Sequence, residues 1–254
     1  MDERSIQTGG TEHLPPPVAV PRHGPGSGPL EDPRALQILT TEHWSLLSAR
    51  SLVYNEAFAR AGMFLTFLSA SLVALALVSQ GMGFDRDFLL LAAIILGFDL
   101  FIGLATLGRV ASASNEDLRC IAGMNRIRHA YLEIAPELEP YFITSPYDDV
   151  RGILSTYGEP SGDHPSMFLG FLHGLTTTDG MISMITTGIA AVFGAVVALL
   201  FGAEPTVAIG VGLATFAAML VVMSATGYRN FSGFVARLGS RFPTPPRTPG
   251  GDAS

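Results

Sequence analysis

The sequence of 254 residues has no lysine, so arginine supplies all 15 of its basic side chains. Charged residues of either sign make up only 15% of the chain, and the formal net charge is −7. Binding to nucleic acid needs a concentrated basic face, so this balance argues against a nucleic-acid partner. Cys120 is the only cysteine. A single cysteine excludes an internal disulfide and any CxxC metal or redox motif.

Catalytic and metal-binding motifs are also missing. The sequence contains no HExxH, Walker A, GxSxG or GxGxxG pattern, each of which carries a defined chemistry. The side chains best suited to bind a metal lie in the polar central region, at spacings that match no established metal motif: His129, Asp148, Asp149, Asp163, His164, His173 and Asp179. We therefore expect a protein that is not an enzyme and that holds no metal or cofactor.

What the sequence does have is long apolar runs. Hydrophobic residues make up 48% of it and concentrate at residues 61–83, 88–108, 182–203 and 205–227. A hydrocarbon layer about 30 Å thick is crossed by about 20 apolar residues in a helix, and each run meets that length. The pattern predicts an all-α, polytopic membrane protein. Its four transmembrane helices would form two hairpins, with long juxtamembrane and cytoplasmic helices attached.

The runs divide the chain into six segments. A disordered Pro/Gly-rich tail (1–31) precedes an amphipathic juxtamembrane helix (32–60) and a first transmembrane hairpin (61–108). A cytoplasmic helical region (109–181) leads to a second transmembrane hairpin (182–227) and a cytoplasmic C-terminal tail that is mostly disordered (228–254).

The helix boundaries follow from capping and breaking signals. Asp32-Pro33 is a helix-start signal, and the helix that follows is expected to run unbroken into the first span. Ser114–Asp117 is expected to cap a new helix over residues 118–138, stopped by Pro140. Shorter helices are expected at residues 148–157 and 166–175. After Arg241 we expect a disordered tail.

The placement of arginine predicts the orientation. Of the 15 arginines, only Arg86 falls in the two short loops between paired spans, and the other 14 fall on the termini or in the central region. Positive charge is retained on the cytoplasmic side of a membrane. We therefore expect a multi-pass protein of the inner (plasma) membrane with both termini in the cytoplasm.

The TEHW…R…YNE run and the apolar stretch after it resemble an uncharacterised group of bacterial four-span membrane proteins. Over residues 33–135 the layout is also similar to SLATT-type membrane modules, in which a juxtamembrane helix feeds a close pair of membrane helices. The first resemblance implies no assigned activity. The second implies pore formation beside a nucleotide sensor, and we recognise no such sensor domain in this sequence.

Asp99 lies near the middle of the second apolar run, where an ionised carboxylate is costly. On a helical wheel it lies on a face that is smaller and more polar than the opposite one, which predicts that it points into the bundle; the other residues of that face are Ala92, Ile95, Gly103 and Thr106. Ser71 and Thr215 lie at matching depth in the first and fourth spans as hydrogen-bond donors. Burial without a basic partner favours the neutral acid. Asp99 either takes part in a proton or cation step, or holds helices together by hydrogen bonding.

Two further patterns leave alternatives open. Small residues recur every four positions in the third and fourth spans, which suits close packing within one chain or in a homo-oligomer: Ala190, Gly194 and Ala198, then Gly210, Ala214 and Ala218. Arg119, Arg126 and Arg128 either contact anionic lipid headgroups or serve only to retain topology.

Two functions therefore compete. The first is a non-catalytic scaffold or regulatory component that acts through cytoplasmic helices on a cytoplasmic protein partner. The second is a small oligomeric channel or transporter that uses the helix face carrying Asp99. In both, the lipid bilayer is the immediate environment. Liposome flux that is lost in Asp99→Asn would favour the second.

Overall fold

The computed structural model describes residues 30–156 and 177–246, and its regular elements are all helices, with no strand in these ranges. Most of the tail expected to be disordered at residues 1–31 lies outside the described residues, as does the helix expected at 166–175. The elements are α1 (Ala35–Met82), α2 (Arg86–Ile134), the 3-10 helix η1 (Pro136–Tyr141), α3 (Val150–Thr156), α5 (Thr178–Leu200) and α6 (Pro205–Arg237).

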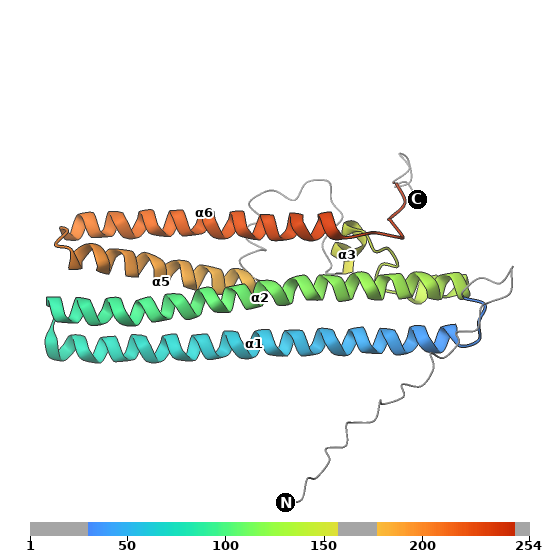
Figure 1. The fold of residues 1–254 in the computed structure, drawn as a ribbon, viewed down its shortest axis with the longest axis horizontal. Helices are drawn as coiled ribbons and strands as arrows, with labels where there is room; N and C mark the ends of the chain where they lie inside the picture. The colour runs from blue at the N-terminus through green and yellow to red at the C-terminus, as the bar shows by residue number, and fades with distance from the viewer. Residues whose placement is uncertain (1–29, 157–176, 247–254) are drawn as a thin grey trace, which may run out of the picture.

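The helices α1, α2, α5 and α6 are each long and apolar enough to cross a membrane, as the four runs predict. They lie side by side in the order α1, α2, α5, α6 (Figure 1). The short links between α1 and α2 and between α5 and α6 lie at one end of the molecule, and α3 lies at the other. That second end carries most of the arginines, so we call it the arginine-rich end.

The helices α1 and α2 reach well beyond their apolar runs. At 1.5 Å per residue, the 26 residues 35–60 of α1 and the 26 residues 109–134 of α2 each add about 39 Å. We call these two segments together the extension. The unbroken first helix expected from the sequence is present, but it begins at Ala35. Asp32 does not cap it, because its carboxylate accepts hydrogen bonds from the Arg34 backbone N–H and side chain instead.

The helix boundary expected near residue 114 is wrong. The helix α2 continues from the apolar run through Ser114 and Asp117 to Ile134. The segment between residues 109 and 117 contains neither glycine nor proline to interrupt it. The polar side chains that looked like a cap bond other helices: the Ser114 hydroxyl lies 2.8 Å from Asp179 Oδ2 of α5, and Asp117 bonds α1. Beyond Ile134, residues expected to stay helical form η1, which contains Pro140.

The main core lies between α1, α2 and α5. A Cβ on Gly103 of α2 would lie 2.9 Å from Thr186 Oγ1 of α5 and 3.2 Å from a ring carbon of Phe64 of α1. The absence of a side chain at Gly103 therefore lets three helices meet. On the other side of α5, Gly212 of α6 packs against Ala191 and Ala195.

A second, smaller core closes the arginine-rich end. Ile121 and Met124 of α2, Ile153 of α3 and Phe234 of α6 are buried together. The short helix expected at residues 148–157 is present as α3. The helix α6 runs ten residues past the end of its apolar run, to Arg237, and so reaches this core.

Candidate functional site

The carboxyl group of Asp99 is fully enclosed, with no exposed surface. Its Oδ1 accepts a hydrogen bond of 3.1 Å from the Ser71 hydroxyl of α1, and its Oδ2 has no hydrogen-bond partner in the described part of the chain. The buried side chains of its helix face include Ala92 and Thr106, as expected. An ionised carboxylate with one hydrogen bond in an apolar core is costly, so this geometry suits the neutral acid.

Thr215, the second donor proposed from the sequence, does not reach Asp99. Its hydroxyl donates 2.8 Å to the carbonyl of Val211 in its own helix. A Cβ on Gly194 of α5 would lie 2.7 Å from Thr215 Oγ1, which places Thr215 at the α5–α6 contact. The depth of Thr215 in its apolar run could be inferred from the sequence, but the order of the helices could not. At this depth α5 lies between α6 and α2 (Figure 1).

Thr187 of α5 carries a second orphaned polar atom. Its side chain has no exposed surface, and its Oγ1 has no hydrogen-bond partner among the described residues. The neighbouring Thr186 is equally buried but donates to the Ile182 carbonyl at 2.8 Å. Among the described residues, Asp99 and Thr187 therefore each place in the apolar helical core one polar atom that a further group could satisfy.

The two small-residue stripes have different surroundings. In α5, Ala190 is buried in the main core and Gly194 lies against Thr215, so this stripe packs within the chain. In α6, Gly210, Ala214 and Ala218 are exposed. The helix α6 faces α5 with Ala208 and Gly212 instead, which are buried.

The extension is held together by ion pairs between α1 and α2. Arg50 Nε lies 2.5 Å from Asp117 Oδ1, and the Tyr54 hydroxyl lies 3.0 Å from Asp117 Oδ2. Asp117 is buried, with 2% of its side chain exposed. Nearer the apolar runs, Arg109 Nη2 lies 2.7 Å from Glu56 Oε1. These partners are more than 50 residues apart, so no local sequence signal reveals the pairing.

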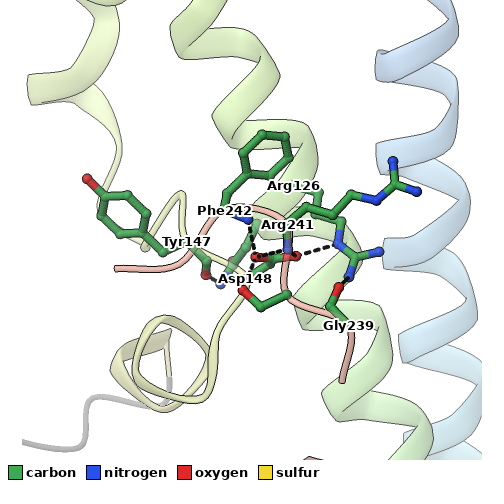
Figure 2. Close-up of polar contacts among 8 residues, drawn as sticks. Arg126, Tyr147, Asp148, Gly239, Arg241 and Phe242 are labelled. Atoms are coloured by element: carbon green, nitrogen blue, oxygen red, sulfur yellow. Dashed lines mark hydrogen bonds and ion pairs between the residues drawn. The ribbon is translucent and has the colours of Figure 1, made fainter. Parts of the chain in front are cut away.

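Asp148, between η1 and α3, holds the chain that follows α6 (Figure 2). Its fully buried carboxylate accepts hydrogen bonds from Arg126 Nε at 2.6 Å, from the Ser240 hydroxyl at 2.8 Å and from the backbone N–H groups of Arg241 and Phe242 at 2.9 and 2.8 Å. The Asp148 N–H donates back to the Phe242 carbonyl at 3.1 Å. We call this arrangement the latch.

The protonation of Asp148 follows from the latch. Burial on its own raises the pKa of this carboxyl, but the hydrogen bonds from the Arg241 N–H, the Arg126 guanidinium and the Phe242 N–H outweigh it and lower the pKa to about 2. Asp148 is therefore ionised at neutral pH and holds its donors through charge-assisted bonds.

Other contacts extend the latch on both sides. Arg126 Nη2 donates to the Gly239 carbonyl at 2.6 Å, and the His129 ring stacks on Phe242 with centroids 4.0 Å apart. The Thr244 hydroxyl lies 2.7 Å from Asp149 Oδ1. The disorder expected after Arg241 is therefore wrong for Phe242 and Thr244. The sequence pattern suggested Asp148 and Asp149 only as metal ligands, and no local signal pairs them with partners more than 90 residues away.

In the described ranges, no group of three or more His, Cys, Asp or Glu side chains is placed to hold a metal ion. Asp148 and His129 serve the latch, and Asp179 bonds Ser114. The candidates at residues 163, 164 and 173 lie outside the described residues.

The three arginines singled out in the sequence do not share one surface. Arg119 and Arg126 line a cleft between α2 and α6, together with Arg229 and Arg237. Arg128 does not line it and donates to Asn125 Oδ1 at 2.7 Å. The two arginines of α6 were not among the residues predicted from the sequence, because nothing in their position after the fourth apolar run shows that they lie beside α2.

Comparison with known proteins gives no assignment. No protein-family model, curated protein or solved structure matches the chain. The resemblances noted from the sequence therefore stay hypotheses, and the function has to be argued from the geometry.

Proposed function

We propose that this protein is a non-catalytic scaffold or regulatory component of the inner (plasma) membrane. Its four apolar helices would cross the membrane as two hairpins, with both termini and the arginine-rich end in the cytoplasm. The extension would then be a cytoplasmic platform that binds a protein partner. The observation that carries this proposal is an exposed apolar stripe on a part of α1 that stands beyond the membrane run.

The stripe consists of Leu36, Trp44, Leu47 and Phe58. Each is at least 40% exposed, and Trp44 is 63% exposed. At 3.6 residues per turn they fall within about 80° of one another around α1. Exposed apolar side chains gathered on one face of a helix in water are typical of an interaction site, and apolar anchors along one face are what an amphipathic helix presents to a partner's groove.

Contacts with other parts of the protein hold the extension in place, which favours a rigid binding surface. The buried Arg50–Asp117 pair joins α1 to α2 within the extension. The latch joins α2 to α3 and to the chain after α6. A partner that bound the stripe would therefore meet a preformed surface, which reduces the entropy lost on binding.

The experiment is site-specific photo-cross-linking in native membranes. A photoreactive residue replaces Leu47 on the stripe or, as the matched control, Leu52. Leu52 is 70% exposed and so more accessible than Leu47, but it lies about 120° around the helix from the middle of the stripe. We expect a protein adduct from position 47 that is absent from position 52. Adducts of equal yield at both positions, or none at position 47, would contradict the proposal.

A small oligomeric channel or transporter is the second candidate. Asp99 Oδ2 and Thr187 Oγ1, which have no hydrogen-bond partner among the described residues, support it, because each oxygen could coordinate a cation or accept a hydrogen bond from water. Proton and cation flux in liposomes tests it. Flux in the wild type that disappears in Asp99→Asn, with the fold intact, would favour the channel over the scaffold.

A further inference from the structure

A cleft of about 490 Å³ separates the extension part of α2 from the last turns of α6. Four guanidinium groups line it, from Arg119 and Arg126 on one side and Arg229 and Arg237 on the other. Amide side chains and backbone complete the polar lining, and no carboxylate belongs to it in the described part of the chain. The cleft thus collects positive charge in a protein whose net charge is −7.

Within residues 30–156 and 177–246, one of the four guanidinium groups has a carboxylate partner. Arg126 is fixed by the carboxylate of Asp148 and the carbonyl of Gly239. Arg119, Arg229 and Arg237 form no ion pair with any residue that the structure describes. Positive charges that line the same cleft repel each other. An anion bound between them adds attraction to each guanidinium group and so offsets this repulsion.

The guanidinium group also selects the kind of anion. Its planar fork of N–H donors matches two oxygens of a phosphate at once, which an ammonium group cannot do. Several forks around one cleft suit a phosphate group, and they disfavour a ligand that carries a positive group beside its phosphate.

The cleft opens at the level of lipid headgroups. The apolar run of α6 ends at residue 227. At 1.5 Å per residue along the helix, the backbone of Arg229 lies about 3 Å beyond the hydrocarbon layer and that of Arg237 about 15 Å beyond it. The headgroup layer on each side of a bilayer is about 5–8 Å deep. The end of the cleft at Arg229 is therefore within reach of lipid phosphates, and its other end extends into water.

We propose that this cleft binds the phosphate group of an anionic phospholipid from the leaflet at the arginine-rich end. The lipid would lie between α2 and α6, with its headgroup on Arg119, Arg229 and Arg237. Binding there would join α6 to the extension beside the latch, since Arg126 belongs to both. The proposal is independent of the partner proposed for the α1 stripe.

The test measures lipid binding to the full chain in detergent, with phosphatidylglycerol and phosphatidylcholine titrated separately. We expect phosphatidylglycerol to bind at least about 10-fold more tightly. An arginine near the membrane surface contributes about 1 kcal/mol, so R229Q/R237Q is expected to weaken phosphatidylglycerol about 30-fold. The matched control, R60Q/R151Q, also removes two exposed arginines, one of them close to the α1 apolar run. It is expected to change binding less than about 3-fold.

Two further arms make the result decisive. R229K/R237K keeps the charges but loses the paired N–H donors of the guanidinium groups, so its affinity for phosphatidylglycerol is expected to lie between those of the wild type and R229Q/R237Q. Thermal melting without lipid checks that each variant folds. Inorganic phosphate is added as a competitor to separate the two sources of phosphate. Phosphate that binds with the same arginine dependence while phosphatidylglycerol does not would overturn the lipid source. Equal binding of both lipids, or an equal loss in the control, would overturn the site.

Discussion

Removal of the Asp148 charge should release the chain after α6. In Asp148→Asn, the amide keeps the volume but presents an NH₂ donor to a site whose four partners are all donors. The pKa of about 2 against an ordinary value of 3.8 corresponds to roughly 2 kcal/mol of preference for the charged form in the folded state. Because Arg126 is 37% exposed and can turn to solvent, we expect a loss near this value and below the 3–5 kcal/mol of a fully buried pair.

Hydrogen exchange at the Arg241 and Phe242 amides measures this directly, since both N–H groups bond Asp148. A loss of about 2 kcal/mol predicts exchange about 30-fold faster in Asp148→Asn. Glu139→Gln is the control, because it removes an exposed carboxylate at the same end of the molecule. It should leave both amides unchanged. Equal exchange in wild type and Asp148→Asn would refute the latch.

The same carboxyl sets a pH dependence of known sign. Its pKa is lower in the folded state than in the unfolded chain, so its contribution to stability is complete above the unfolded value near pH 4. The contribution is lost as the pH falls from about 4 through about 2. Acid should therefore release the latch in wild type and should have little further effect on these two amides in Asp148→Asn.

The remaining predictions concern the other parts of the molecule. Asp99→Asn should melt in detergent close to wild type, whereas Asp99→Leu, which strands the Ser71 hydroxyl, should lose about 0.6 to 2 kcal/mol. Asp117→Ala leaves a half-buried arginine unpaired and should cost about 3 kcal/mol in the same melting assay. Deletion of residues 247–254 should leave the melting temperature unchanged. Deletion of 239–254 removes the chain held by Asp148 and should lower the melting temperature. Equal melting temperatures for the two truncations would contradict this.

The spans were predictable because composition alone determines them. An apolar run of about 20 residues is long enough to cross a membrane as a helix, and all four runs form helices long and apolar enough to do so. The boundary near residue 114 failed for a physical reason. Serine and aspartate favour helix caps, but in α2 Ser114 and Asp117 find partners on other helices, and tertiary bonds override the local preference.

The sites depend on which helices are neighbours, and no local pattern carries that information. Ser71 lies in the helix adjacent to Asp99 in sequence and is found beside it. Thr215 has the right depth but lies beyond α5. The latch joins Asp148 to residues more than 90 positions away, so neither its bonds nor the arginine cleft beside it could be inferred from spacing.

The claim on which the scaffold proposal depends most is that the arginine-rich end lies in the cytoplasm. The direct measurement is cysteine accessibility in intact cells, with Cys120 replaced by serine and a single cysteine placed at Glu139, which is exposed at that end. We expect a membrane-impermeant thiol reagent to label this cysteine only after the cells are permeabilised. Labelling in intact cells, at the rate of a cysteine placed at exposed Phe84 in the α1–α2 link, would contradict it.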